Sequence, residues 1–531
     1  MVELFLTAPS QHEYEGALKS AIDSRIASRI AENDPTEWGP DAVSEASIRL
    51  SWTGLAESSR PLIAEIIALR ESLAAKGLDH VVLCGMGGSS LAPEVICHTY
   101  GVPLTVLDSS QPDMVRSAIA DRLDRSIVVV ASKSGGTIET DSQRRAYEKA
   151  FTDAGLTPTD HIIVVTDPGS PLDKEATAAG YRVFHADPNV GGRYSALTAF
   201  GLVPSGLAGA DVGELLDQAA SVQDDVALDG ADNPALRLGV LLGVAHRHRV
   251  DKLVMADQSR HGFGDWIEQL VAESTGKNGK GILPVVVPFE NAVNFNPSTA
   301  DSILLSIDGH DAPEAQSGYG IAIKATLGAE MLVWETAVAV AGSVIGINPF
   351  DQPDVESAKQ AARDMLGGAG VEPTPDFTAD GIDVYGAEGT TVADAVASLL
   401  GQLDLHHGYV ALQVYLDRFD HADFAAAREI VAQRTGRPTT FGWGPRFLHS
   451  TGQYHKGGPR TGVFLQITGD PVEDLEVPGR DFTFGSFIQS QAAGDAAVLR
   501  ERGRPVVRLH LKDVPAGLQL LRTVLAGKGE A

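Results

Sequence analysis

Five runs of apolar residues constrain the fold of this chain more than any other feature of its sequence. They are rich in β-branched residues, and each ends in Gly, Asp, Ser or Ala ahead of a stretch with helical periodicity. The runs are HVVLCG (80–85), PLTVLD (103–108), SIVVVAS (126–132), HIIVVTD (161–167) and YRVFHA (181–186). Continuous apolar runs of this kind are typical of parallel strands buried on both faces and joined by right-handed crossovers. The sequence therefore predicts an α/β fold built on a doubly wound parallel sheet.

The same pattern returns twice further along the chain. A second sheet is predicted by KLVMAD (252–257), ILPVVVP (282–288) and SILLSID (302–308). A long apolar helix at 329–346 approaches the length of a membrane span, but Glu330, Glu335 and the α/β surroundings favour a buried core helix. A shorter α/β region follows, with helices expected in DAVASLLGQL and ADFAAAREIVAQRTG and strands in YVALQVYL, TGVFLQI and PVVRLHL.

These patterns divide the 531 residues into five segments. A chain of this length suits several cores rather than one. We expect an N-terminal helical segment (1–75), a first doubly wound domain (76–210), a second one (211–366), a linker rich in Gly and Pro (367–391) and a smaller C-terminal α/β region (392–531).

The net charge of −28 argues against two classes of partner. Nucleic acids and anionic membrane surfaces both attract clustered Lys and Arg, so we expect neither as a partner. Only Cys84 and Cys97 are present, and the N-terminus lacks the basic and apolar regions of a signal peptide, which predicts a cytoplasmic protein. An anionic substrate would need a local positive site within this negative chain.

The loop after the first predicted strand, GMGGSSLAP (85–93), opens a helix. Its glycines let the backbone approach a ligand closely, and a helix N-terminus favours an anion. Gly85, Gly87 and Asp108 also fit a dinucleotide-binding fingerprint, although Ser90 occupies the third glycine position. A sugar phosphate, a dinucleotide and a plain tight turn all stay open for this loop by itself.

The loop after the third predicted strand, SKSGGTIET (132–140), favours the sugar phosphate. Hydroxyl groups at Ser132, Ser134 and Thr137, the cation of Lys133 and the N–H groups of a helix start together make a phosphate cradle. A dinucleotide fold has no use for such a loop at its third strand. The same residues also suit an ordinary helix start with Glu139 in its first turn, and both interpretations can hold together.

Two later segments carry candidate catalytic groups. In NVGGRYSALTAFGL (189–202), Arg193 follows two glycines; a surface Arg is usually solvated, but beside two phosphate-type loops it becomes a candidate electrophile. In WIEQLVAESTGKNGKG (266–281), Gln269 and Glu273 are four residues apart and share a helix face, although a Glu at a helix end is usually a solvated charge. The GKNGKG stretch lacks the spacing of a nucleotide-binding P-loop.

Taken together, GMGGSSLAP, SKSGGTIET, VGGRYS and AESTGK resemble, in order and spacing, the motifs of glucose-6-phosphate isomerases, which are built from two sugar-isomerase domains. NPFDQPDVESAK (348–359) resembles that family's segment with a catalytic lysine, here Lys359. The resemblance covers roughly residues 80–365 and is closest to the isomerase half of fused transaldolase/glucose-6-phosphate isomerases. A transaldolase barrel needs about 250 residues. The stretch before residue 75 has no room for one, so we expect no transaldolase activity.

The resemblance implies a role for each motif in converting glucose 6-phosphate to fructose 6-phosphate and back through an enediolate. Glu273 would be the base, Arg193 would stabilise the enediolate, and Lys359 would assist at the ring oxygen or its neighbouring hydroxyl. Substrate contacts would come from Gly88, Ser89, Ser132, Lys133, Ser134, Thr137, Gly192 and Gln269. We expect no metal and no other cofactor, because no histidine pair here has zinc-type spacing.

The sequence departs from the family at the ring-opening histidine, which a glutamate matching Glu139 would orient. In the family this histidine lies between the base and the lysine and crosses from the neighbouring subunit of a dimer. No histidine with a matching motif lies between 274 and 359. The best match is GPRFLHSTGQYHKGGP (444–459), which makes His449 the first candidate and His455 the second. A C-terminal region can supply this group within one chain, so a homodimer stays open.

Two other functions stay open from the sequence. The same machinery serves another anionic sugar, such as mannose 6-phosphate or a sulfosugar, because a phosphate cradle does not by itself distinguish these anions. The second is a non-catalytic regulator that binds a sugar phosphate. Such a protein has no need of Glu273 and Lys359, and both are present.

Overall fold

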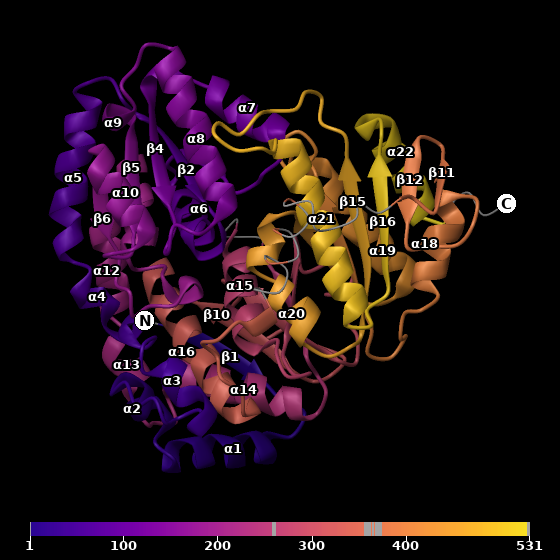
Figure 1. Ribbon diagram of the computed structural model, residues 1–531. Coiled ribbons are helices and arrows are strands. Elements are labelled where there is room, and N and C mark those ends of the chain that lie inside the picture. The colour runs from indigo at the N-terminus through magenta and orange to yellow at the C-terminus, as the bar shows by residue number, and fades with distance from the viewer. Residues whose placement is uncertain are drawn as a thin grey trace.

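Three β-sheets with helices on their faces organise the chain (Figure 1). The structure, a computed structural model, describes residues 2–257, 262–354, 360, 363, 366 and 374–527. In Figure 1 the first sheet lies at the upper left, the second below it and the third at the right. The α/β class and the parallel sheets predicted from the sequence are confirmed.

The first sheet contains the five predicted strands in the order β3-β2-β4-β5-β6, all parallel. Their bounds are β2 His80–Gly85, β3 Thr105–Leu107, β4 Ser126–Ala131, β5 Ile162–Thr166 and β6 Arg182–His185. Every residue of β2, β4 and β5 is buried, and this explains their continuous apolar runs. The strands are parallel, so the loops that follow β2, β4 and β6 leave the sheet at one edge.

Three elements begin at or near that edge: the short helices η3 (Gly87–Ser89) and η5 (Gly192–Tyr194), and the long helix α8 (Ile138–Asp153). The other helices of this unit are α6 Leu91–Tyr100, α7 Pro112–Ala120, η4 Leu123–Arg125, α9 Pro158–His161, α10 Pro171–Ala179 and α11 Ala199–Ala208. The N-terminal helices are α1 Gln11–Asp23, α2 Ile26–Ala31, η1 Pro40–Ala42, α3 Val43–Ala46, η2 Ser51–Gly54, α4 Leu55–Ser58 and α5 Pro61–Ala74.

The second sheet has the order β1-β10-β9-β7-β8. Four strands are parallel: β7 Lys252–Ala256, β8 Leu283–Val287, β9 Ser302–Ile307 and β10 Gly320–Lys324. The fifth, β1 (Glu3–Thr7), pairs antiparallel with β10 at the sheet edge. The expectation that residues 1–75 are purely helical is therefore wrong at its start. The alternating exposure of β1 marks an edge strand, and five residues are too few for a clear sequence signal.

The helices of the second unit are α12 Val212–Ala220, α13 Gln223–Ala227, α14 Pro234–Arg247, α15 Phe263–Thr275 and α16 Leu327–Ile345. Among the described residues, α16 is the one helix long and apolar enough to cross a membrane, and 89% of its apolar window is buried inside the protein. Its position matches the core helix that the sequence predicts.

The third sheet has the order β11-β12-β16-β15-β13-β14. Its strands are β11 Phe377–Ala379, β12 Ile382–Tyr385, β13 Tyr409–Tyr415, β14 Thr439–Trp443, β15 Gly462–Gly469 and β16 Val506–Leu511. Its helices are α18 Val392–Leu400, η6 Ala422–Ala426, α19 Ala427–Thr435, η7 Arg446–His449, α20 Gly452–Gly457, α21 Phe484–Glu501 and α22 Val514–Leu525.

The segment expected to be a linker, 367–391, is partly sheet. From residue 377 it forms the antiparallel pair β11–β12, and β12 pairs with β16. Residues 367–373 lie outside the described part of the chain. Among the described residues of this segment, Asp380 and Gly381 form the tight turn between the two short strands, and both have positive φ. The third sheet is therefore larger than the sequence pattern indicated.

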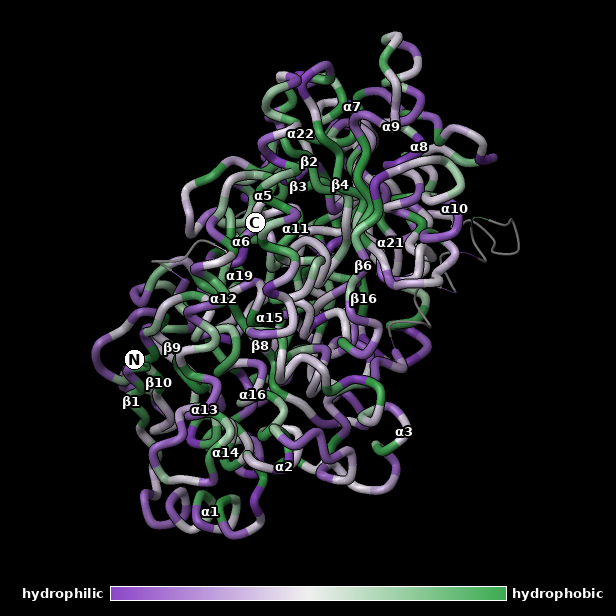
Figure 2. Tube along the Cα trace, turned by 90° about the vertical axis from the view of Figure 1, so that its left-hand side faces the viewer, coloured by the Kyte–Doolittle hydropathy of each residue, from purple (hydrophilic) through white to green (hydrophobic). Residues whose placement is uncertain are grey.

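Shared apolar clusters hold the C-terminal unit against the other two. One cluster joins Val254 of β7 to Phe464 of β15, and another joins Val82 of β2 to Phe484 of α21. Figure 2 shows hydrophobic residues along the interior strands and hydrophilic ones on outer helices such as α1. Close-packed interiors of this kind resist displacement, so the loops at the junction of the three units have fixed relative positions.

Candidate active site

Two glycine loops of the first unit pack backbone to backbone. A Cβ atom on Gly88 would lie 1.9 Å from the carbonyl oxygen of Gly192, so no side chain fits at position 88. Gly87 has a φ of +57°, and a Cβ there would lie 2.8 Å from Nε2 of Gln269. These glycines let η3, η5 and α15 approach one another, and they bring the first two units together at the edge of the first sheet.

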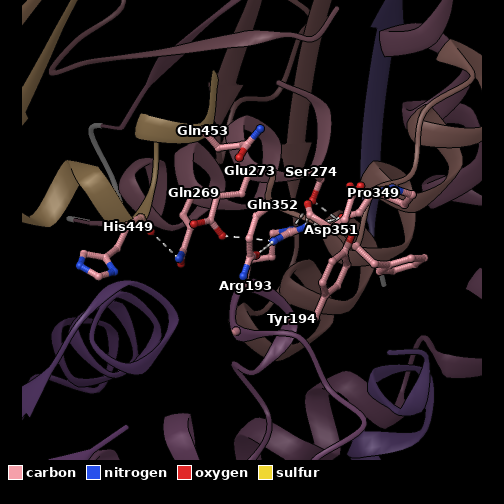
Figure 3. Close-up of polar contacts among 12 residues, drawn as sticks. Arg193, Tyr194, Gln269, Glu273, Ser274, Pro349, Asp351, Gln352, His449 and Gln453 are labelled. Atoms are coloured by element: carbon pink, nitrogen blue, oxygen red, sulfur yellow. Dashed lines mark hydrogen bonds and ion pairs between the residues drawn. The ribbon is translucent and has the colours of Figure 1, made fainter. Parts of the chain in front are cut away.

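A buried ion pair joins the first two units. Nη1 of Arg193, in η5, lies 3.4 Å from Oε2 of Glu273, in α15. The Nε of Arg193 donates to Oγ of Ser274 at 2.9 Å. The exposed fractions of Arg193 and Glu273 are 2% and 6%. Figure 3 shows the Arg193 and Glu273 side chains pointing toward each other, with Gln269 beside Glu273 on the same helix. A cation and a carboxylate therefore meet where little water weakens their field.

Arg193 and Lys277 together hold the segment that leads toward Lys359. Arg193 donates to the Gln352 side chain at 2.6 Å, and Lys277 donates to the main-chain and side-chain oxygens of Asp351 at 2.6 and 2.7 Å. Burial, helped by the nearby charge of Arg193, lowers the pKa of the Lys277 ammonium to about 8. Lys359 itself lies outside the described residues, so its role stays a prediction.

The C-terminal unit brings His449 to the same junction. Its Nε2 lies 3.0 Å from Oε1 of Glu139, and its carbonyl oxygen accepts a hydrogen bond from Nε2 of Gln269 at 2.7 Å. Glu139 is in the first turn of α8, where the helix dipole favours a carboxylate. Within one chain, the structure thus places His449 beside the glutamate that was expected to orient it.

His455, the second histidine candidate, is in the core of the C-terminal unit instead. It is 2% exposed, its Nδ1 lies 3.0 Å from the hydroxyl of Tyr409, and its ring packs against Phe464. Burial, and then the charges of Lys456 and Arg504, lower its pKa well below the ordinary value. A neutral histidine enclosed by aromatic rings serves packing rather than proton transfer at the junction.

Buried ion pairs fix η7, the element that carries His449, against the first unit. Arg446 lies 2.6 Å from Glu94 and 3.1 Å from Asp108, and Arg418 lies 3.0 Å from Glu94. Burial alone would raise the pKa of Glu94, but Arg446 and Arg418 outweigh it and lower that pKa to about 2. Asp108, which fits a ribose-binding acid in the sequence pattern, is therefore a partner of two arginines from the C-terminal unit.

The predicted phosphate loop surrounds the start of α8, but its lysine is already paired. Oγ of Ser132 accepts from the N–H of Gly135 at 3.2 Å and lies 3.4 Å from Oγ1 of Thr137. Nζ of Lys133 lies 2.7 Å from Asp167. The hydroxyls and N–H groups of the loop, rather than a free cation, are thus available to an anion. Of the other predicted contacts, Ser134 and Gly192 are exposed, and Ser89 is half-buried.

Comparison with known proteins relates part of the chain to one family. A family model described as phosphoglucose isomerase matches residues 55–286. A probable glucose-6-phosphate isomerase of Natronomonas pharaonis is 28% identical over 378 residues, which cover 62% of this chain and 88% of that protein. A glucose-6-phosphate isomerase of Thermosynechococcus vestitus is 29% identical over 407 residues, which cover 65% of this chain and 76% of that protein.

Over residues 55–286 the chain is thus similar to the phosphoglucose isomerase family. Solved structures agree at the level of the fold. The crystal structure of a glucose-6-phosphate isomerase from Chlamydia trachomatis matches with a TM-score of 0.57 at 18% identity. The match covers 69% of this chain and 89% of the Chlamydia trachomatis chain. The crystal structure of a hypothetical protein from Thermus thermophilus matches with a TM-score of 0.58 at 24% identity. The match covers 69% of this chain and 100% of the Thermus thermophilus chain. The sugar-isomerase-type fold expected from the sequence is confirmed.

Three residues of the candidate site were not singled out from the sequence. Gln352 and Lys277 both lie inside family motifs, NPFDQPDVESAK and AESTGK, so a signal was present. Gln491 lies in no motif, yet its Nε2 donates to Glu139 at 2.7 Å. The family match stops at residue 286, so the part that the C-terminal unit plays is read from the structure. Among the described residues, no group of three or more His, Cys, Asp or Glu is placed to hold a metal ion.

Proposed function

We propose that this chain interconverts glucose 6-phosphate and fructose 6-phosphate by moving a proton between C2 and C1. The buried contact between Arg193 and Glu273 is the observation that supports the proposal most directly. It puts a carboxylate and a guanidinium side by side at the junction where Gln269 contacts His449. A base next to a cation suits a reaction in which negative charge builds on an oxygen beside the carbon that loses its proton.

Glu273 is the base in the proposed step. Its carboxylate takes the proton from C2 of the open-chain aldose, the C2–H electrons form the C1–C2 double bond, and the carbonyl oxygen on C1 takes the negative charge. Arg193, held by Ser274 and Gln352, stabilises that charge. Glu273 then returns the proton to C1 while a proton passes from the C2 hydroxyl to the C1 oxygen, which yields the ketose.

His449 opens the sugar ring. As an imidazolium paired with Glu139, it gives a proton to the ring oxygen while the bond from that oxygen to C1 breaks. The proton of the C1 hydroxyl leaves to a base, a role we give to Lys359, and the C1 aldehyde forms. Because Glu139 binds Nε2, Nδ1 is the ring atom left for the transfer.

The phosphate binds at the start of α8. We assign its contacts to the hydroxyls and N–H groups of the segment 132–137, with Ser89 and the backbone around Gly88 and Gly192 closing the pocket. Lys133 contributes less than the sequence suggested, because its ammonium is paired with Asp167. A helix N-terminus lined by hydroxyls binds a phosphate without a neighbouring lysine.

The site is built by a single chain, and we infer a cytoplasmic setting. The His449 that reaches Glu139 belongs to the same chain, so ring opening needs no neighbouring subunit even if a homodimer forms. Cys84 and Cys97 are both buried and free, which suits a reducing compartment.

A coupled assay tests this function. Fructose 6-phosphate is supplied to the full chain with excess glucose-6-phosphate dehydrogenase and NADP, and NADPH is followed. We expect a steady signal with and without EDTA, and a kcat about 10²- to 10⁴-fold lower for Glu273→Gln because an amide cannot take the C2 proton. Glu268→Gln makes the same chemical change on the same helix and is expected to keep most of the activity.

Two outcomes count against the proposal. No NADPH from the unmodified chain would overturn the isomerase function itself. Loss of the signal with EDTA would contradict the expectation of a metal-free reaction and leave the isomerase function standing.

A further inference from the structure

Gln491 of α21 gives the pair Glu139–His449 a second link to the C-terminal unit. Its Nε2 donates at 2.7 Å to Oε1 of Glu139, the same carboxylate oxygen that lies 3.0 Å from Nε2 of His449. Gln491 is 4% exposed. Two groups from separate elements of the C-terminal unit, η7 and α21, thus meet on one oxygen of the first unit.

Ser110 fixes the direction of the Gln491 amide. Ser110 is fully buried, and its hydroxyl donates to Oε1 of Gln491 at 2.5 Å. A flipped amide would point its oxygen at the acceptor-only carboxylate of Glu139 and lose that hydrogen bond. The contacts therefore form an ordered series, from Ser110 to Gln491 to Glu139, with His449 on the same oxygen.

A buried ion pair keeps α21 in register with the element that follows η7. Asp495, one turn beyond Gln491, lies 2.5 Å from Nζ of Lys456 in α20 and accepts from Nε2 of Gln466 at 3.0 Å. Asp495 and Lys456 are 0% and 2% exposed. Displacing either helix would leave a buried charge without its partner, which is strongly unfavourable. The positions of Gln491 and His449 are thus fixed relative to each other.

We propose that Gln491 is a positioning residue for ring opening, which fixes the Glu139 carboxylate so that it holds the His449 imidazole in one orientation. This inference rests on the function proposed above. Gln491 touches no substrate in it and acts only through Glu139. Preorganised hydrogen bonds of this kind support a catalytic group because its partner need not reorient during the reaction.

Loss of the Gln491 hydrogen bond is expected to shift the pH dependence of ring opening in one direction. A hydrogen bond to a carboxylate stabilises its charge, so the Gln491 N–H competes with the imidazolium of His449 for the negative charge on Oε1. Without this N–H, the carboxylate interacts more strongly with the imidazolium, which then keeps its proton to higher pH. A second carboxylate at position 491 would add negative charge and move the change further in the same direction.

Ring opening can be measured separately from isomerisation. In a Glu273→Gln background, where C2 proton transfer is blocked, exchange between the two anomers of glucose 6-phosphate is followed by NMR. Gln491→Met keeps the length of the side chain without its N–H, and we expect it to slow the enzyme-catalysed exchange by about 10- to 100-fold. We also expect the pH midpoint of exchange to rise in this variant, and to rise by about one unit in Gln491→Glu.

Gln489→Met is the matched control. Gln489 is on the same helix, but its Nε2 donates to the carbonyl of Gly469 at 3.2 Å and makes no contact with Glu139. We expect Gln489→Met to keep the exchange rate and the pH midpoint of the Glu273→Gln parent. Ser110→Ala leaves Gln491 in place and removes only the donor that orients it, so a smaller loss with a shift of the same sign is expected.

Glu268 is the titratable group that must be separated from this readout. Its carboxyl accepts from Oγ of Ser450, next to His449, at 3.2 Å. Burial and the charge of Asp265 raise its pKa to about 8. Arg446 and Arg428 also act on Glu268, from η7 and α19. Adding Glu268→Gln to each variant removes this titration, and the shifts caused by the changes at position 491 are expected to persist.

The outcomes distinguish this inference from the function on which it rests. If the unmodified chain is an active isomerase but Gln491→Met and Gln491→Glu keep the parent rate and midpoint, the positioning role is overturned. Equal losses in Gln489→Met would overturn it as well. If Gln491→Met does not fold, Gln491→Glu and Ser110→Ala decide, and an unshifted midpoint in both contradicts the proposal.

Discussion

Two buried cations share one short segment at the centre of the site. Arg193 donates to the Pro349 carbonyl at 2.7 Å, and Lys277 donates to the Asn348 carbonyl at 2.8 Å. The guanidinium stays charged at every accessible pH, whereas the buried ammonium does not. At the residue scale, the pH response of the site is therefore expected to come from Lys277 rather than from Arg193.

We expect activity to fall as pH rises through about 8, because Lys277 loses its proton there and holds the 348–351 segment less firmly. Lys277→Met is expected to lower kcat/KM at neutral pH by about tenfold, since it removes hydrogen bonds from a charged donor, and to abolish this alkaline fall. The coupled assay run from neutral to alkaline pH measures both effects. Lys280→Met is the control, because Lys280 donates to the carbonyl of Ile345 instead. An unchanged alkaline fall in Lys277→Met would contradict the assignment.

Lys277 also affects the stability of the fold, and here its effect with rising pH is opposite to its effect on activity. Folding lowers the pKa of Lys277 from an ordinary 10.5 to about 8, so the unfolded chain binds more protons between these values. Stability contributed by this residue therefore rises with pH across that window. Lost activity near pH 8 thus reports a local change at the segment rather than unfolding.

At the scale of elements, η7 is a short helix that is held in place by ion pairs rather than by its own helical hydrogen bonds. Four residues form too few helical hydrogen bonds to be stable alone. Its first residue, Arg446, pairs with Glu94 and Asp108 across the domain junction, and its last residue is His449. The ion pairs at one end of η7 therefore set the place of the imidazole at the other.

We expect Arg446→Met to destabilise the fold by about 3 kcal/mol, because it leaves buried carboxylates with one cation fewer, and to slow ring opening as well. Arg418→Met is matched to it, since Arg418 pairs with the same two acids but lies outside η7. It is expected to cost similar stability and to keep more of the activity. Urea unfolding and the coupled assay under folded conditions measure the two effects. Equal activity losses would contradict the role of η7.

The same cluster predicts behaviour in acid. The pKa of Glu94 is lowered from 4.5 to about 2, so its contribution to stability is complete above about 4.5 and is lost as pH falls toward 2. We expect this loss of stability in acid to be smaller in Arg446→Met and in Arg418→Met.

At the scale of the whole molecule, three units of one chain contribute to a single site. The first supplies Arg193 and Glu139, the second supplies Glu273, and the third supplies His449. The shared apolar clusters between units make this arrangement a property of the folded chain. The proposed catalytic groups of one site then belong to one polypeptide.

Mixing two inactive variants tests this arrangement. Glu273→Gln and His449→Ala chains, unfolded and refolded together, are expected to regain no isomerase activity, because every site in the mixture still lacks one group. Refolded unmodified chain is the control for the procedure. Recovery of activity in the mixture would show that His449 serves a neighbouring subunit, as the family resemblance implies for its usual histidine.

Much of the fold followed from local patterns. The strands β2, β4 and β5 of the first sheet are buried throughout, so most of their residues are apolar, and their ends are marked by the turn residues that follow. Edge strands such as β1 and β11 carry no such run and were missed. The strand β14 was missed as well, because Thr439–Trp443 includes a glycine and has mixed burial.

The sequence by itself determined the two doubly wound units, the loops at their strand ends and the candidate residues Arg193, Gln269 and Glu273, because each of these depends on neighbours within a few positions. The sequence made His449 the first candidate and His455 the second, and the tertiary structure decided between them by placing His449 against Glu139, 310 residues away. Only the tertiary structure decided which glutamine supports Glu139, since Gln491 is 352 residues away. It also decided that Lys133 pairs with Asp167. Contacts of this kind are set by how separate cores pack, and no local pattern of residue types records that packing.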